Sequence, residues 1–242
     1  MKHAVIACTL MILATFAPPA NASFTTVEPT PHATELTHEE VFEALYLGDF
    51  MLSGNDFIGM GPLAGINAIR VDDDLDPLGI LNVVLGLPGS AADQVWDDGA
   101  VTATAEARYA TYTQQFGLDR GQGVEVLFDV VGSGLAVTGN AVVDISGDTW
   151  TWVRRNTDGT NAYYSEDARN PDGLDHMVTY RMEGLDTDET VWQVFWEDVP
   201  GPLDDPSDRD FNDLVVEIRA VPEPATLALL LAAAPFAIRR RK

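Results

Sequence analysis

The side chains best suited to chemistry lie in an acidic segment before the last predicted strand and at the end of the strand before it. Six residues carry the oxygen atoms concerned: Glu197, Asp198, Asp208, Asp210, Asn212 and Asp213. Calcium takes about six to eight hard oxygen ligands, which closely spaced Asp and Asn side chains and loop carbonyls supply. The spacing therefore predicts a calcium site between two strands. An EF-hand is excluded, because Asp213 occupies its glycine position and Arg219 its twelfth position.

Another interpretation of these acidic residues stays open. Asp and Asn side chains also close loops by bonding their own backbone, with Arg209 offsetting part of the charge. A second acidic run, from Asp72 to Asp76, is better explained as a solvated turn than as another ion site. If calcium binds, we expect a structural role first, because an ion that binds only the folded chain stabilises it by mass action.

No catalytic residue is predicted. The chain has no HExxH motif and no close His/Cys cluster, which argues against a zinc site. His176 lies beside Asp175, but on a predicted strand with Val178 and Tyr180 it is better explained as a packed core residue. No Gly-x-Ser-x-Gly motif and no phosphate-binding glycine motif is present. A glycosidase needs two carboxylates. In a chain with so many acidic residues this requirement does not single out any pair as catalytic.

The tryptophans suggest an alternative hypothesis. Trp150 and Trp152 share one face of a strand, as do Trp192 and Trp196. Aromatic faces on β-sandwiches can stack on sugar rings, although alternating tryptophans more simply indicate core. Adjacent tyrosines 163 and 164, in a segment rich in Asn and Asp, are better candidates for exposed contacts.

Alternating apolar residues dominate the elements that must position these side chains. The predicted strands are 103–109, 124–130, 141–145, 149–153, 177–182, 191–198 and 214–220, with a hairpin turn at Ser146–Asp148. Thr37 to Glu40 has capping-box spacing and predicts one short helix over 38–47, whereas 54–67 is glycine-rich and predicts loop. The expected fold is mainly β: an antiparallel β-sandwich, with a jelly roll as one form of it.

Both chain ends indicate export. Lys2 precedes an apolar stretch, and Ala20-Asn21-Ala22 gives a cleavage site before Ser23, as in a secretory signal peptide over 1–22. Signal peptidase is thus an expected partner. Residues 23–36 are expected to be a flexible lead and 37–220 a single sandwich domain.

The expected mature chain is strongly acidic. The whole chain has 14 basic and 38 acidic residues; without residues 1–22 and 222–242 these become 9 and 37, a net charge of −28. Such a surface repels nucleic acid and attracts cations. Adaptation to salty water would explain the large total negative charge. Divalent-cation sites would explain why some of the acidic residues occur in clusters.

The C-terminal segment 221–242 has three parts in order. The box Pro222-Glu223-Pro224 precedes an apolar run over 225–238, and Arg239, Arg240, Arg241 and Lys242 follow. This layout resembles the PEP-CTERM sorting signal, which implies processing by an exosortase. The run is short for a permanent membrane span, because 14 residues cover roughly 21 Å as a helix. We therefore expect transient membrane insertion through this helix.

A second resemblance covers residues 172–221. The segment Asp-Arg-Asp-Phe-Asn-Asp-Leu-Val-Val over 208–216, after Trp196-Glu197-Asp198, is similar to a bacterial extracellular domain of unknown function that often precedes PEP-CTERM tails. This resemblance implies a secreted β-sandwich with a calcium site and no established enzymatic activity.

The sequence thus predicts a non-enzymatic protein exported through the inner membrane of a Gram-negative-type bacterium. Its expected place is the cell envelope, outer surface or biofilm matrix, where a calcium-stabilised sandwich would act structurally or adhesively. Exopolysaccharide and other surface proteins are the expected partners there. The alternative is a carbohydrate-binding module acting on exopolysaccharide, and an extracellular hydrolase comes third.

Overall fold

The structure is a computed structural model that describes residues 27, 35–71, 95–97, 99–145, 149–187, 189–198 and 209–221. Several sequence predictions lie outside these residues: the signal peptide with its cleavage site at Ala22 and Ser23, the acidic run 72–76, Asp208, and the sorting signal.

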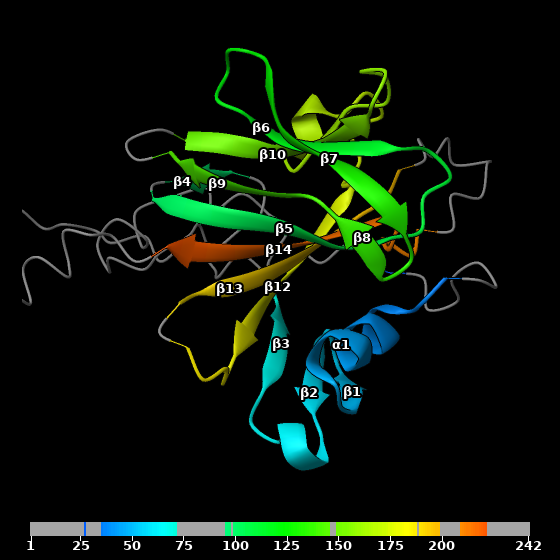
Figure 1. Cartoon of the computed structure of the whole chain (residues 1–242), viewed down its shortest axis with the longest axis vertical. Helices are drawn as coiled ribbons and strands as arrows, with labels where there is room; N and C mark the ends of the chain where they lie inside the picture. The colour runs from blue at the N-terminus through cyan, green and yellow to red at the C-terminus, as the bar shows by residue number, and fades with distance from the viewer. Residues whose placement is uncertain are drawn as a thin grey trace, which may run out of the picture.

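The described strands form two antiparallel sheets, of eight and six strands, stacked as a β-sandwich (Figure 1). The larger sheet has the order β1 (Phe50–Ser53), β2 (Asp56–Gly59), β3 (Asn67–Arg70), β12 (Met177–Glu183), β13 (Val191–Trp196), β14 (Leu214–Val221), β5 (Ala100–Arg108) and β9 (Asn140–Asp144). The smaller sheet has the order β11 (Tyr163–Tyr164), β10 (Thr149–Asn156), β6 (Gln114–Asp119), β7 (Val124–Ser133) and β8 (Ala136–Thr138), with β4 (Trp96–Asp97) paired to β10. The predicted mainly-β, antiparallel sandwich is confirmed.

One hydrophobic core fills the space between the two sheets. It includes Trp192 and Trp196 of the larger sheet and Trp150 and Trp152 of the smaller one, all buried. Trp152 stacks on Phe116 with ring centroids 5.1 Å apart. The interpretation of these tryptophans as core is confirmed, so none of them forms a surface for stacking on sugars.

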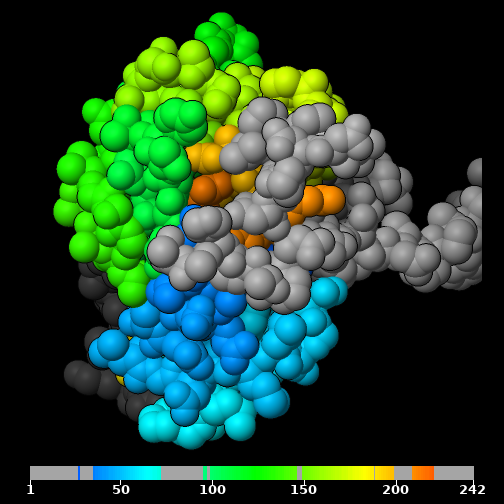
Figure 2. Space-filling view, turned by 90° about the vertical axis from the view of Figure 1, so that its right-hand side faces the viewer, coloured from blue at the N-terminus to red at the C-terminus, as the bar shows by residue number. Residues whose placement is uncertain are grey.

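A second core lies on the opposite face of the larger sheet. There α1 (His38–Tyr46) packs on strands of this sheet, with Phe42 against Phe57 of β2, Tyr180 of β12 and Phe195 of β13. In Figure 1 α1 and β1–β3 lie below the sandwich, and Figure 2 shows this part of the chain, blue to cyan, as a lobe below the green part of the sandwich. Strand β13 therefore has apolar neighbours on both faces, and all six of its residues are buried.

Helix α1 begins at the predicted capping box. The Thr37 hydroxyl accepts a hydrogen bond from the Glu40 amide at 3.2 Å, and the Glu40 carboxylate accepts one from the Thr37 amide at 2.8 Å. These two bonds satisfy backbone donors that the first helical turn leaves free. The helix prediction is confirmed.

Two local predictions were wrong. The glycine-rich segment 54–67 contains β2, the short 3-10 helix η1 (Gly61–Leu63) and the start of β3, because its glycines supply turns with positive φ between short strands. The predicted hairpin at 146–148 joins strands in different sheets: β9 pairs with β5, whereas β10 pairs with β6.

The register of β13 and β14 places the candidate site. These strands pair antiparallel, with Trp196 opposite Leu214, so the end of β13 lies beside the start of β14. Leu214, Val216 and Ile218 face the inter-sheet core and Val215 faces the second core, as the alternation predicts. The acidic residues that flank this pair are thereby brought to one end of the sandwich.

Candidate functional site

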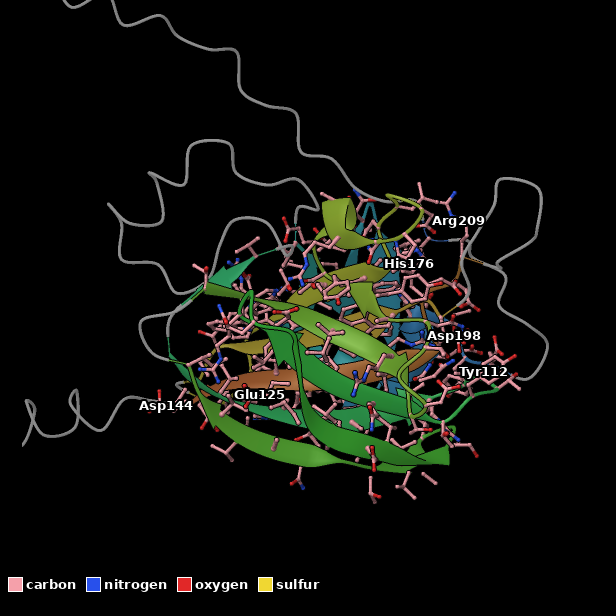
Figure 3. The ribbon with its side chains drawn as sticks, turned by 90° about the horizontal axis from the view of Figure 1, so that it is seen from above. Tyr112, Glu125, Asp144, His176, Asp198 and Arg209 are labelled. Atoms are coloured by element: carbon pink, nitrogen blue, oxygen red, sulfur yellow. The ribbon has the colours of Figure 1, made fainter. Side chains whose placement is uncertain are left out.

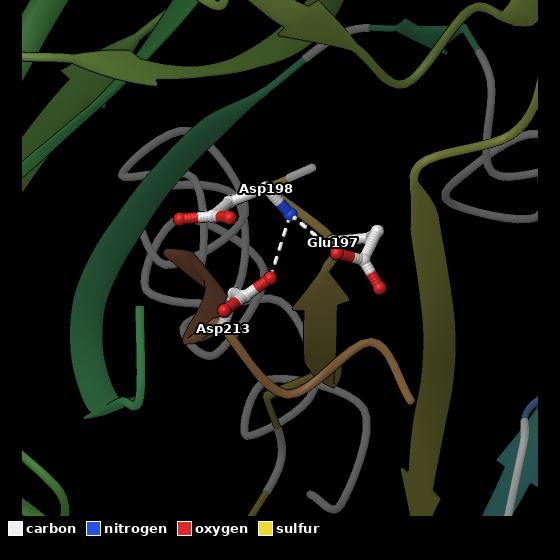
Figure 4. A group of neighbouring side chains, drawn as sticks. All are labelled: Glu197, Asp198 and Asp213. Carbon is white, nitrogen blue, oxygen red and sulfur yellow. Dashed lines mark hydrogen bonds between the residues drawn. The ribbon is translucent and has the colours of Figure 1, made fainter. Parts of the chain in front are cut away.

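Three of the predicted ligand residues meet at this end of the sandwich (Figure 4). Glu197 and Asp198 directly follow β13, and Asp213 directly precedes β14. One carboxylate oxygen from each lies within 4.8 Å of the others. Such a group can hold a metal ion through oxygen ligands, the type that calcium prefers.

Backbone hydrogen bonds orient two of the three carboxylates, those of Glu197 and Asp213. The Asp198 amide donates to Asp213 Oδ2 at 2.7 Å and to Glu197 Oε1 at 3.0 Å. The Glu197 amide in turn donates to the carbonyl of His176 at 3.0 Å. Figure 3 shows His176 and Asp198 at the same end of the molecule, opposite the end that carries Glu125 and Asp144.

The smaller sheet contributes two polar side chains to the same place. From β10, Arg154 Nη2 lies 2.9 Å from Asp198 Oδ2, and from β6, Gln114 Nε2 donates to the same oxygen at 3.3 Å. Arg154 and Gln114 are both 0% exposed, and Asp198 is 5% exposed. Asp198 therefore links the two sheets through a buried ion pair and a hydrogen bond.

Burial and like charge shape the electrostatics of the carboxylates. Burial, followed by the nearby charges of Asp198 and Glu197, raises the pKa of Asp213 well above its usual range. Burial lowers the pKa of Arg154, and the neighbouring Asp198 and Asp213 carboxylates oppose that shift. Three carboxyl groups thus share a place that strongly favours additional positive charge.

The side chains of Asp210 and Asn212 engage each other. Asp210 Oδ2 accepts from Asn212 Nδ2 at 2.9 Å and Asp210 Oδ1 accepts from the Asn212 amide at 3.2 Å. Asn212 Nδ2 also donates to the Leu36 carbonyl at 2.9 Å, which ties this loop to the segment before α1. Between them, Phe211 packs into the second core with φ at 55°. These contacts are those of a loop closed on its own backbone, the second interpretation of the sequence.

His176 is a packed residue beside the site. Its Nε2 lies 2.9 Å from Asp172 Oδ2, and its ring stacks on Tyr163 with centroids 3.9 Å apart. Burial lowers the pKa of His176, against the effect of Asp172. Tyr163 is itself buried, so its prediction as an exposed contact was wrong; Tyr164 is partly exposed, with the Arg169 guanidinium 4.0 Å from its ring centroid.

Gln114 and Arg154 were not among the site residues predicted from the sequence. Arg154 follows Trp150 and Trp152 at alternating positions of β10, on the side of the strand that faces the core, and a charged residue at such a position is a signal for a buried partner. Gln114 precedes the alternation of its own strand and offers no such signal. Only the pairing of β6 with β10, Gln114 opposite Asn156, brings it to the site.

Comparison with known proteins identifies one family match. The chain matches a domain of unknown function (DUF4114) over residues 141–221, which include every residue of the carboxylate group. No curated protein matches the sequence. Within the described residues, no helix has both the length and the apolar character needed to cross a membrane.

Solved structures show a partial likeness to bacterial lectins. A Chromobacterium violaceum lectin in complex with alpha-methyl-fucoside is 16% identical, with 54% of this chain and 98% of that chain covered and a TM-score of 0.36. A Ralstonia solanacearum high-affinity mannose-binding lectin is 18% identical, with 54% and 97% covered and a TM-score of 0.33. The C-terminal domain of a Burkholderia cenocepacia lectin is 14% identical, with 54% and 97% covered and the same TM-score.

Proposed function

We propose that this chain is an exported, non-enzymatic protein of the cell envelope or extracellular matrix whose sandwich is stabilised by calcium. The observation that carries the proposal is the meeting of Glu197, Asp198 and Asp213 at the paired ends of β13 and β14. Their oxygen atoms are hard ligands, and this group contains no His or Cys, which favours calcium over zinc or copper.

A calcium ion at this point would act as a structural link. It would join the end of β13 to the start of β14 and neutralise carboxylates that repel one another. Binding to the folded state alone adds about 2.7 kcal/mol of stability when calcium is 100-fold above its dissociation constant. The fold of a surface or matrix protein would therefore be more stable in surroundings that contain calcium.

Calorimetric titration tests the calcium site. The purified protein is titrated with calcium beside two variants, Asp213→Ala in the carboxylate group and Asp210→Ala in the neighbouring loop. We expect saturable binding to the unaltered protein and to Asp210→Ala, and its loss in Asp213→Ala. Absence of saturable binding at millimolar calcium would reject the proposal. The acidic residues would then only close and pack the loop.

Export and sorting form a separate part of the proposal. It is supported by the N-terminal stretch ending at Ala22 and by the box Pro222-Glu223-Pro224 with its basic end. Replacing the three box residues with alanine should leave the chain in the membrane fraction of an exosortase-containing host, whereas the unaltered chain should reach the surface. Equal distribution of both chains would reject processing at this box.

Carbohydrate binding is the alternative role for the same sandwich. The tryptophans that suggested it are buried, and the aromatic side chains with exposed surface here include Tyr112, at 58%, and Tyr164. Glycan-array binding tests this role, and fucosides and mannosides are suitable first probes because they are named for the partially similar lectins. Binding that is lost in Tyr112→Ala or Tyr164→Ala would favour the carbohydrate-binding module.

A further inference from the structure

We propose that Arg154 is a built-in counter-charge that competes with a divalent cation for Asp198, an inference that rests on the calcium site proposed above. Arg154 holds the cation-free fold together and at the same time weakens cation binding. Its removal should therefore change stability and affinity in opposite directions.

The first support is the fixed position of the guanidinium. Arg154 Nη2 lies 2.9 Å from Asp198 Oδ2, and its Nη1 donates to the Asn161 carbonyl at 3.2 Å. The Tyr163 ring lies against it, with its centroid 5.6 Å from the guanidinium carbon. Because the side chain is completely buried, solvent and salt screen its charge weakly.

The second support is a buried oxygen beside the same carboxylate. Gln114 donates through Nε2 to Asp198 Oδ2, while its Oε1 has no hydrogen-bond partner among the described residues. A buried carbonyl oxygen without a partner is costly. Rotation of the amide by half a turn exchanges the two atoms and presents Oε1, a calcium-type ligand, to an ion held by Asp198. The site would then take ligands from both sheets.

The third support is the balance of charge. With Arg154 in place, one carboxylate of the group already has a cation, so the fold tolerates the absence of calcium. A divalent ion bound by the same carboxylate would lie close to the guanidinium, and like charges at such separations repel strongly in a poorly hydrated interior. Arg154 thus supplies the positive charge beside Asp198 when no ion is bound, and the bound ion would supply that charge when the site is occupied.

The experiment compares three variants of the purified protein by calcium titration calorimetry and by thermal unfolding in chelator. Arg154→Met removes the charge and keeps a long side chain, and Arg154→Lys keeps the charge. Arg155→Met is the matched control: it removes the same charge one residue away, where the side chain bonds Gln115 on the outer side of the strand.

We expect Arg154→Met to bind calcium about tenfold or more tightly than the unaltered protein, because it lacks the competing charge. In chelator it should unfold at a lower temperature than Arg155→Met, and calcium should restore most of the loss. Arg154→Lys and Arg155→Met should keep the affinity of the unaltered protein to within about threefold. An Arg154→Met chain that folds only when calcium is added would also support the inference, because the ion would then replace the missing positive charge.

The outcomes separate this inference from the calcium site itself. If the unaltered protein binds calcium and Arg154→Met binds it no more tightly, the counter-charge inference is overturned and the calcium site stands. If only Arg154→Met binds calcium, the proposed calcium function fails and the competition by Arg154 is supported. An Arg154→Met chain that stays unfolded with and without calcium overturns the inference, because the ion then does not replace the charge.

Discussion

Arg154 and Asp198 form an ion pair between the two sheets, with Nη2 and Oδ2 2.9 Å apart and side chains 0% and 5% exposed. A second pair in the same sandwich, Arg120 with Glu125 at 3.0 Å, has side chains 31% and 54% exposed. The two pairs have almost the same length and differ in burial, which makes them a matched comparison.

A double-mutant cycle should separate the two pairs. For Arg154→Met and Asp198→Asn in chelator, we expect a coupling free energy of about 2–5 kcal/mol, because each single change leaves a buried charge without its partner. For Arg120→Met and Glu125→Gln, water and salt screen the charges and the coupling should lie below about 1 kcal/mol. Urea unfolding of each set measures both, and similar couplings would contradict the assigned role of burial.

His38 should make the fold sensitive to acid. It is buried against Phe195 with its Nδ1 3.0 Å from the Tyr180 hydroxyl, and burial, assisted by Arg70, lowers its pKa from 6.5 to about 3. Below pH 6.5 the unfolded chain therefore takes up this proton first, and the stability that neutral His38 contributes is lost as the pH falls toward 3.

The variant His38→Gln isolates this effect. It keeps a polar group for Tyr180 and cannot take up the proton, so its stability relative to the unaltered protein should improve by about 1.4 kcal/mol for each pH unit below about 6. Chemical unfolding at several pH values measures the difference. Parallel pH profiles for the two proteins would contradict the buried, neutral state of His38.

Glu106 should have the opposite pH dependence. Burial, followed by the charge of Glu217, raises its pKa to about 7, while Arg219 opposes the shift. Its folded pKa is above the unfolded value, so its contribution is favourable below 4.5 and is lost as the pH rises through about 7. Glu106→Gln should therefore raise the melting temperature more at high pH than in mild acid. Equal changes in melting temperature at the two pH values would contradict the raised pKa of Glu106.

Removal of calcium should lower the melting temperature of the protein. Stabilisation of about 2.7 kcal/mol at 100-fold excess over the dissociation constant corresponds to roughly 5–10 °C for a domain of this size. Scanning calorimetry with calcium and with EDTA, at constant ionic strength, measures the shift. The shift should vanish in Asp213→Ala, and an unchanged curve for the unaltered protein would argue against a bound stabilising ion.

The fold was predictable wherever local signals agreed with tertiary packing. Alternation along 103–107 predicted a strand with Ala103, Ala105 and Ala107 on one side, and all three are buried; the capping box predicted the start of α1. The short strands β1–β3 escaped prediction, because they are stabilised by packing of Phe50 and Phe57 under α1 and carry turn-like glycines around them. Turn chemistry at 146–148 could not tell whether the next strand joins the same sheet or the facing one.

Only the part of the site that comes from the paired strands β13 and β14 was predictable from the sequence. Glu197, Asp198 and Asp213 flank two strands whose alternation is plain, so their approach follows once those strands pair. Arg154 and Gln114 come from the facing sheet, and their position depends on how the two sheets stack. The choice of Asp213 over Asp210 depends on backbone geometry: Asp210 closes its own loop, which residue spacing does not reveal.

Crystallography with calcium shows directly whether an ion binds between Glu197, Asp198 and Asp213. Crystals grown with and without calcium would be compared in anomalous difference maps. We predict a peak about 2.3–2.6 Å from carboxylate oxygens of Glu197, Asp198 and Asp213 in the calcium form alone. A map without a peak among these three carboxylates, at calcium concentrations that saturate binding in solution, would rule out calcium binding by this group.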